Sequence, residues 1–294
     1  MLMSMTATEE HERGWRKERV VMAAEGVHRF SIGDFACMVL CDSDVPPSEE
    51  SSISFVNATD DEVRAAMRVL ATHGTPRGMS NNILLVDTGQ HRVLVDTGDG
   101  VIEGKPGRLL ERLAVAGVAP TDIDTVIITH GHDDHVGGNV DPSGQATFPN
   151  ARYLITRTEW DYWTTRTPEP RFSGRTYLLA VASQVTFIDP GAEIVPGIQT
   201  VPLSGHTPGQ IAVLITSAGE RLLHMADNFH HPVEVLHPEW YFDFDDDPQQ
   251  TVASRRSLFE RATREQLPAL AYHVAFPGLG RVVSEGDGWR WVHG

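Results

Sequence analysis

Cysteine and long apolar runs are both scarce in this chain of 294 residues. Only Cys37 and Cys41 occur, too few for a disulfide framework or a thiolate metal site, so we expect two ordinary buried thiols. No apolar stretch approaches the roughly 18 residues that a membrane-spanning helix needs. The N-terminal sequence, MLMSMTATEEHERGWRKERVV, carries charges where a secretory signal needs a continuous apolar segment. We therefore expect no membrane association and a cytoplasmic location.

Basic residues are also few, since 24 Lys and Arg stand against 40 Asp and Glu and give a net charge of −16. They form no cluster along the chain, and a nucleic acid backbone is held mainly by clusters of lysine and arginine. Nucleic acid is therefore not an expected partner, and solubility is the simplest role of the negative charge. Hydrophobic residues make up 40% of the chain, enough to bury a large core.

The order of the predicted elements indicates a layered α/β protein. Residues 1–26 are polar and mixed in charge, and we predict a mobile N-terminal arm there, followed by a single domain over residues 27–294. Strand, turn and strand follow one another in residues 27–44 and again in 81–100, and residues 60–74 have a helical pattern. Runs of consecutive strands interrupted by a few helices favour two sheets packed on each other with helices outside.

A dense group of histidines and aspartates directly follows one apolar strand, in VIITHGHDDHVGG at residues 126–138. His130, His132, Asp134 and His135 fit the pattern H-x-H-x-D-H, which is expected by chance only about 0.002 times in such a chain. Neutral imidazole and carboxylate are normal ligands of Zn²⁺ and similar ions. His130 and His132 are two apart in an extended segment, so they can reach one ion together. Asp134 and His135 can face a second ion after the chain turns, which leaves Asp133 as a spacer.

Three later positions can complete two metal sites: His206 in a turn framed by Gly and Pro, Asp227 at the end of a strand, and His273 after another strand. Together with the triplet Asp96-Thr97-Gly98, this order of motifs resembles the metallo-β-lactamase superfamily over residues 81–280. The resemblance implies an αββα sandwich of two mixed sheets with outer helices, carrying two metal ions at the edge of the sheets.

The resemblance also implies a role for each of these residues. It assigns His130, His132 and His206 to one metal, Asp134, His135 and His273 to the other, and Asp227 to both as a bridge. Asp96 falls where the family has a carboxylate that orients the ligand loop. We expect two divalent ions, in the first place Zn²⁺, while Mn, Co and Fe also suit these ligands.

A bridging Asp227 favours the lactonase, thioesterase and phosphotriesterase branches over true β-lactamases. Lactonases place a tyrosine three residues after the bridge, where this chain has His230, as in the methyl parathion hydrolase-like branch. That branch also shares the H-x-x-F-P-G-x-G run at His273, the acidic FDFDDD stretch and a C-terminal hydrophobic tail, GWRWV. The chain departs from it at Gln210 and Ala226, which are not ligand positions but affect the shape of the pocket. Relatives are often dimers, so a homodimer stays open.

Aromatic residues provide candidates for the substrate pocket. Trp160 and Trp163 are three apart on a predicted helix and are expected to be core residues. A second group lies in a loop close in sequence to His230, and apolar pockets of this kind are the usual small-molecule sites. Its members are Trp240, Tyr241, Phe242 and Phe244.

The expected activity is hydrolysis of a small-molecule ester, lactone or phosphotriester by a metal-bridging hydroxide. One metal together with His230 would stabilise the developing negative charge, and Asp227 or a metal-bound water would deliver a proton to a poor leaving group. The alternatives are an iron-dependent oxidoreductase resembling the persulfide dioxygenases, and a β-lactam hydrolase. Diiron oxygen reductases have glutamate at the position of His132, and a nuclease is opposed by the net charge. A scaffold protein on a decayed fold is opposed by the complete set of seven ligands.

Overall fold

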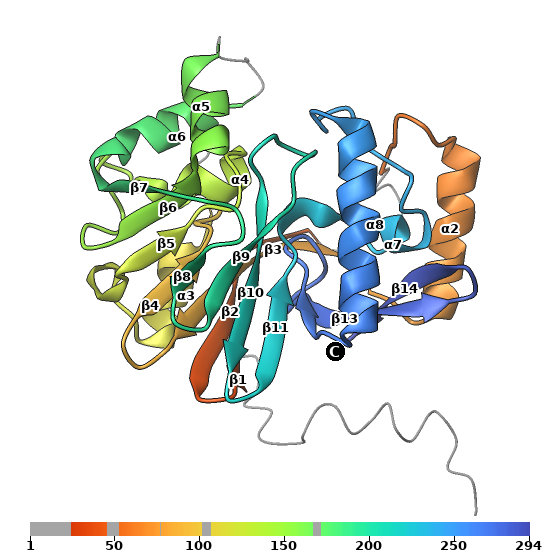
Figure 1. Cartoon of the computed structure of the whole chain (residues 1–294), viewed down its shortest axis with the longest axis horizontal. Coiled ribbons are helices and arrows are strands. Elements are labelled where there is room, and N and C mark those ends of the chain that lie inside the picture. Colours follow the sequence, from red (N-terminus) through yellow and green to blue (C-terminus); the bar gives the residue numbers. More distant parts are fainter. Residues whose placement is uncertain (1–24, 46–52, 77, 102–106, 167–171) are drawn as a thin grey trace, which may run out of the picture.

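The computed structural model describes residues 25–45, 53–76, 78–101, 107–166 and 172–294 (Figure 1). The predicted N-terminal arm therefore lies outside the described residues, apart from a turn at Glu25 and Gly26. In the described part, two seven-stranded sheets form the body of the protein. No helix in these ranges is long and apolar enough to cross a membrane.

The first sheet follows the order of the chain. Its first four strands pair antiparallel and the remaining neighbours pair parallel. The predicted hairpin turn is confirmed, because Asp87 pairs with Arg92 and Thr88 N–H donates to His91 C=O across 2.9 Å. The strands are β1 (Val27–Ile32), β2 (Phe35–Val45), β3 (Met79–Asp87), β4 (Arg92–Val95), β5 (Thr125–Ile127), β6 (Arg152–Thr156) and β7 (Val185–Ile188).

The second sheet has the order β14-β13-β12-β11-β10-β9-β8, and only β11 and β12 pair parallel in it. The C-terminal GWRWV sequence is part of a regular strand that pairs with β13. In this strand Trp291 is buried, and the neighbouring residues are partly exposed. The strands are β8 (Glu193–Val195), β9 (Ile198–Pro202), β10 (Ile211–Ser217), β11 (Glu220–His224), β12 (Ala269–Leu270), β13 (Leu279–Glu285) and β14 (Gly288–His293).

The two sheets share one apolar layer, in which Val39 and Leu84 of the first sheet join Val213 and Ile215 of the second. Helices cover the outer faces, as Figure 1 shows for α5 and α8 on opposite sides. The expected αββα sandwich of two mixed sheets is thus confirmed. The helices are α2 (Asp60–Thr72), α3 (Leu109–Ala116), α4 (Asp133–Val136), α5 (Arg157–Thr165), α6 (Gly174–Ala180), α7 (Val233–Leu236) and α8 (Pro248–Arg264), with 3-10 turns at Pro120–Asp122, Gly137–Asn139, Ala182–Gln184 and Ala226–Asn228.

Both cysteines are buried free thiols on β2, as expected. Burial raises the pKa of Cys37 to about 12 and that of Cys41 to about 11. A thiol must ionise to act as a nucleophile or metal ligand, so neither cysteine contributes chemistry near neutral pH.

Candidate metal centre

Strand ends from both sheets bring four separate segments to one place. His130 and His132 lie in the loop after β5, and His132 is the N-cap residue of the short helix α4. His206 lies in the turn between β9 and β10, Asp227 in the 3-10 turn after β11, and His273 after β12. The polar groups therefore collect where the sheet backbone ends and loops can turn inward.

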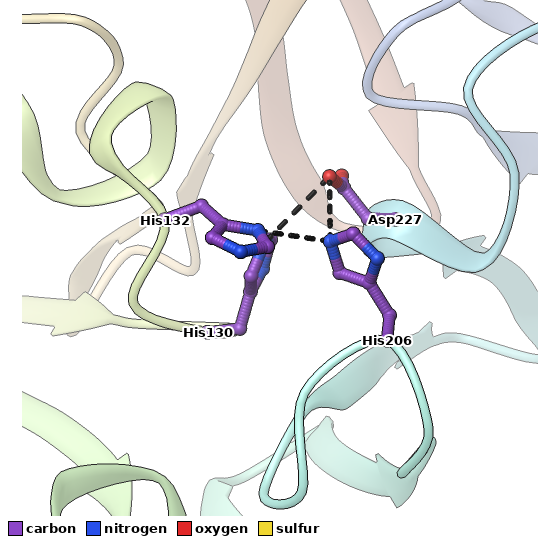
Figure 2. A group of neighbouring side chains, drawn as sticks. All are labelled: His130, His132, His206 and Asp227. Atoms are coloured by element: carbon purple, nitrogen blue, oxygen red, sulfur yellow. Dashed lines mark hydrogen bonds and ion pairs between the residues drawn. The ribbon is translucent and has the colours of Figure 1, made fainter. Parts of the chain in front are cut away.

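The first group joins three histidines and the predicted bridging carboxylate (Figure 2). His132 Nδ1 lies 3.0 Å from His130 Nε2 and 2.9 Å from His206 Nε2. Asp227 Oδ2 lies 3.6 Å from His130 Nε2 and 3.5 Å from His206 Nε2. The ligand atoms of this group all lie within 4.8 Å of one another.

The second group lies on the other side of Asp227 and contains the remaining predicted ligands, Asp134, His135 and His273. His273 Nε2 is 3.4 Å from Asp134 Oδ2 and 3.2 Å from Asp227 Oδ2. Asp227 Oδ1 is 3.1 Å from His135 Nε2. The structure therefore brings all seven predicted ligands together, with Asp227 between the two groups.

Divalent cations fit the chemistry of this donor set. Three imidazole nitrogens face one another: His130 Nε2, His132 Nδ1 and His206 Nε2. Lone pairs of neutral imidazoles repel each other at this distance, and a cation between them removes that repulsion. Tetrahedral ligands at about 2.0 to 2.1 Å from one Zn²⁺ lie about 3.3 Å apart, close to these separations. His135 Nε2 and Asp227 Oδ1 are buried and make no hydrogen bond of good geometry, as expected for atoms that bind a cation.

Burial keeps the first histidines in the form that binds metal. It lowers the pKa of His130 and of His132 well below the ordinary value, so both imidazoles stay neutral. Burial alone would raise the pKa of Asp227, but the surrounding histidines, above all His135, hold it well below its usual range. Metal binding requires neutral imidazole and ionised carboxylate, and His130, His132 and Asp227 have these forms at neutral pH.

Asp96 lies directly behind one predicted ligand. Its carboxylate is fully buried, accepts hydrogen bonds from Thr129 N–H at 2.8 Å and Thr129 Oγ1 at 2.7 Å, and lies 2.8 Å from His135 Nδ1. This contact places the hydrogen of His135 on Nδ1 and the lone pair on Nε2, which faces the cluster. The geometry is that of the orienting carboxylate predicted for this position.

Replacing Asp96 by Asn should lower metal affinity about 10- to 100-fold. The new amide would point its hydrogens at His135 Nδ1 and would force the imidazole hydrogen onto Nε2, toward the metal position. Titration of metal-free protein with Zn²⁺ against a chelating dye measures the change. Asp87→Asn is the matched control, because Asp87 begins the same Asp-Thr-Gly triplet in the hairpin turn. Equal affinities for the two variants would contradict this role of Asp96.

His206 has an equivalent carboxylate behind it that sequence reasoning missed. Asp245 Oδ1 lies 2.8 Å from His206 Nδ1, and Asp245 Oδ2 accepts from Phe242 N–H at 2.9 Å. Burial opposes its ionisation, but the hydrogen bond with His206 holds the pKa of Asp245 below its usual range. The FDFDDD stretch contains this residue, but nothing in that acidic run distinguishes Asp245 from its exposed neighbours.

His230 lies beside the two groups and forms a third one with Asp227 and His273. His230 Nε2 is 3.2 Å from Asp227 Oδ2, and the ring stacks on that of His273 at 5.1 Å. Burial lowers the pKa of His230, but the Asp227 carboxylate outweighs burial and raises it to about 10. The Nε2 edge of His230 therefore faces the cluster as a hydrogen-bond donor.

Two of the four candidate pocket aromatics reach the cluster. Phe244 lies 5.7 Å from the ring of His206 and 5.3 Å from that of His230, and Phe242 lies 5.0 Å from His230. Trp240 instead stacks on His237 at 4.1 Å and packs on Phe55 beneath α2. Tyr241 is half-buried, and its backbone pairs with Val56 and Asn57.

Other aromatic and acidic residues take roles that the sequence did not indicate. Phe172 lies 4.7 Å from the ring of His132. Trp163 is a buried core residue, as expected, and also lies 5.4 Å from His132. Asp133, the spacer of the motif, turns away from the cluster and accepts from Ser173 N–H at 2.6 Å.

The two departures from the methyl parathion hydrolase-like pattern have local consequences. Ala226 adopts φ of 45° directly before Asp227, in the left-handed region that favours glycine and costs other residues on the order of 1 kcal/mol. Gln210 is buried, and neither polar atom of its amide has a hydrogen-bond partner among the described residues.

The protein is a sandwich of two mixed sheets with histidines and aspartates gathered at the strand ends. This arrangement is that of a metallo-hydrolase fold. Comparison with known families identifies the family within that class. The model of the metallo-beta-lactamase superfamily matches residues 76–273, and the chain belongs to this superfamily.

Solved structures agree over almost the whole chain. AidC, a dizinc quorum-quenching lactonase, is 28% identical with a TM-score of 0.83, over 92% of this chain and 97% of that chain. AbOPH, a hydrolase in the beta lactamase superfamily, is 25% identical with a TM-score of 0.79, over 91% of this chain and 97% of that chain.

Curated relatives match over shorter segments. An N-acyl homoserine lactonase of a Bacillus species is 27% identical over 154 residues, which are 45% of this chain and 56% of that protein. This chain matches only 28%, 46% and 21% of the lengths of three other curated relatives.

Proposed function

We propose that this protein is a metal-dependent hydrolase of small lactones and esters, with two divalent ions at the metal centre. The convergence of three imidazole nitrogens and a shared carboxylate, at separations that suit ligands of one ion, carries the proposal. Bound divalent ions would supply a Lewis acid and a nucleophile derived from water near neutral pH. His130, His132, His206 and Asp227 would hold one ion, and Asp134, His135, His273 and Asp227 the other.

The residues of the chain divide the remaining work. Asp96 and Asp245 fix the rings of His135 and His206, so that each presents Nε2 to the centre. His230 presents its Nε2 edge where negative charge would develop on a substrate oxygen. Phe242 and Phe244 stack on each other at 4.7 Å beside His230 and would exclude water from an apolar part of the substrate.

Lactones come first among the substrates because AidC and the Bacillus relative are both lactonases. The histidine at position 230 and the sequence runs shared with the methyl parathion hydrolase-like branch support including aryl esters and phosphotriesters.

A hydrolysis panel combined with metal analysis tests this function. Purified protein is loaded with Zn²⁺, Mn²⁺ or Co²⁺ and assayed on acyl-homoserine lactones, aryl esters, thioesters, phosphotriesters and β-lactams. We expect turnover of lactones or esters that is lost on chelation and restored by metal. A single iron with no zinc would instead indicate the oxidoreductase alternative, and preferred turnover of β-lactams the β-lactamase alternative. Full metal content without turnover on any substrate would contradict the proposal.

Replacing His230 by Ala should keep the metal content and lower kcat about 10²- to 10³-fold, the usual cost of removing a donor to developing negative charge. Metal analysis and steady-state kinetics on the best substrate measure both quantities. His237→Ala is the control, because His237 lies at the other end of α7 and is half-exposed. Loss of metal in His230→Ala would show that His230 is a ligand, as its group with Asp227 and His273 allows.

A further inference from the structure

Glu159 occupies a position on α5 where a glutamate normally caps its own helix. Thr156 is the N-cap residue of α5, and its side chain accepts from Glu159 N–H at 3.1 Å. The sequence Thr-x-x-Glu is typical of a capping box, in which the glutamate returns to the N-cap N–H. Helix α2 has this complete arrangement, since Glu62 accepts from Thr59 N–H at 2.8 Å. In α5 the glutamate makes other contacts.

The Glu159 carboxylate points into the protein and accepts four hydrogen bonds. Oε1 accepts from Gly131 N–H at 2.9 Å and from Trp163 Nε1 at 2.7 Å. Oε2 accepts from Thr207 Oγ1 at 2.8 Å and from Gly209 N–H at 2.9 Å. The side chain is fully buried, so these four donors replace the water that an exposed carboxylate would bind.

These donors come from the two loops that carry the first metal group. Gly131 lies between His130 and His132, whereas Thr207 and Gly209 follow His206 in the other loop. One carboxylate therefore joins two segments about 75 residues apart in the chain, which belong to different sheets. The indole of Trp163, which donates to Oε1, also lies 5.4 Å from the ring of His132.

The two loops approach Glu159 and Trp163 so closely that a side chain larger than that of glycine would not fit at Gly131 or Gly209 without a shift. A Cβ atom at Gly209 would lie 2.3 Å from Glu159 N, and one at Gly131 would lie 2.4 Å from the Trp163 ring. Both loops thus approach α5 closely at glycines, and the Glu159 carboxylate lies between them.

We infer that Glu159 is a positioning residue of the metal centre, which holds the His130–His132 loop and the His206 turn at the separation that one cation requires. The inference rests on the proposed metal-dependent function, because it assigns those histidines to a common ion. Glu159 acts through backbone amides and Thr207, and touches neither the substrate nor a cation.

Glu159→Gln tests the inference with little change in volume. Either oxygen that becomes an amide group would face at least one N–H, of Gly131, Trp163 or Gly209, and two donors would repel each other. We expect Co²⁺ affinity of metal-free protein to fall about 10- to 100-fold. We also expect the visible absorption band of bound Co²⁺ to shift and weaken, because that band reports the ligand geometry.

Two controls separate positioning from general stability. Glu62→Gln changes the matched glutamate of α2 and should leave Co²⁺ binding as in the wild type. Leu113→Ala removes a buried side chain of α3 and should lower the melting temperature without altering the Co²⁺ band. Thr207→Val removes one of the four donors and should weaken Co²⁺ binding to a smaller extent, which keeps the test valid if Glu159→Gln does not fold.

The outcomes distinguish this inference from the proposed function. Wild-type Co²⁺ affinity and absorption in both Glu159→Gln and Thr207→Val would overturn the positioning role, even if hydrolysis is found. A protein that binds Co²⁺ and loses that binding in Glu159→Gln, yet hydrolyses nothing, would refute the proposed activity and leave the positioning role intact.

Discussion

Asp227→Asn is expected to lose at least one bound metal and to lower hydrolysis by at least about 10³-fold, more than the 10²- to 10³-fold typical of one electrostatic contact. Asp227 Oδ2 lies within 3.6 Å of nitrogens from His130, His206, His230 and His273, and Oδ1 lies 3.1 Å from His135. An amide of the same shape carries no charge and offers one acceptor oxygen, so it cannot serve both groups. Metal analysis and kinetics on the same preparation measure the two losses.

Asp133→Asn is the matched control for this change. Asp133 lies in the central motif, but its carboxylate accepts from Ser173 N–H and points away from the cluster. We expect its metal content to equal that of the wild type and its activity to change by less than about fivefold, since weakening one partly exposed hydrogen bond costs only about 1 kcal/mol. Two bound metals in Asp227→Asn would refute the bridging role, and equal metal loss in both variants would indicate that the motif as a whole had been disturbed.

The sequence was sufficient for the features that depend on local pattern. The H-x-H-x-D-H motif combines unusual residue types at fixed spacing, and the strand before it and the loop that contains it are local in sequence. The hairpin at Thr88 and Gly89 and the helix over residues 60–74, which ends before Gly74 with φ of 67°, follow from turn and capping preferences. The two-sheet arrangement followed from the order of strands and helices.

The features that the sequence did not reveal depend on contacts between distant segments. A strand was predicted before His273, and β12 lies there, but β13 and β14 lacked a clear pattern because they are defined by pairing with one another and with β12. Glu159 carries a capping-box pattern that predicts an exposed side chain, but tertiary packing turns the carboxylate inward. Asp245 lies among similar aspartates, and only the approach of His206 gives it a different role from theirs.

Acidic side chains recur as supports of the candidate metal centre. Asp96 contacts His135, Asp245 contacts His206, and Glu159 holds the backbone on both sides of the first group. Each carboxylate accepts a hydrogen bond from a group on a ligand or ligand loop, and that group points away from the centre. Part of the negative charge of the chain is therefore buried and structural, beyond the contribution to solubility expected from composition.

One buried ion pair stabilises residues 227–244, the segment that carries Asp227, His230 and the pocket aromatics. Arg255 of α8 and Glu234 of α7 are both inaccessible to solvent, and Arg255 Nη2 lies 2.8 Å from Glu234 Oε1. Arg255 also donates to the carbonyl groups of Asn228, Pro238 and Trp240. Glu234 Oε2 accepts from the N–H groups of His230 at 2.7 Å and His231 at 2.9 Å. The pair thus fixes both ends of the segment.

Arg255→Met should lower the free energy of unfolding by about 3 to 5 kcal/mol, because it leaves a buried carboxylate without its cation. Thermal or chemical denaturation of the metal-free protein measures this loss. Arg256→Met, the next residue on α8, removes an exposed arginine 3.4 Å from Glu239 and should cost less than about 1 kcal/mol. Adding Glu234→Gln to Arg255→Met should restore part of the stability, since no unpaired charge then remains buried. A loss in Arg255→Met no larger than that in Arg256→Met would contradict the role of the pair.

The pH dependence of the same variants provides a second test of the ion pair. Burial opposes ionisation of Glu234, but Arg255 outweighs burial and holds the pKa of Glu234 below the ordinary value of 4.5. A carboxyl group with a lowered pKa contributes stability above its unfolded pKa, and that stability is lost as the pH falls through the folded value. The difference between the wild type and Arg255→Met should therefore be larger near pH 7 than below about pH 4.5, and it should narrow as the pH falls. Denaturation midpoints measured from pH 7 downward give this difference, and a gap that stays constant or widens on acidification would show that Glu234 is not ionised in the folded protein.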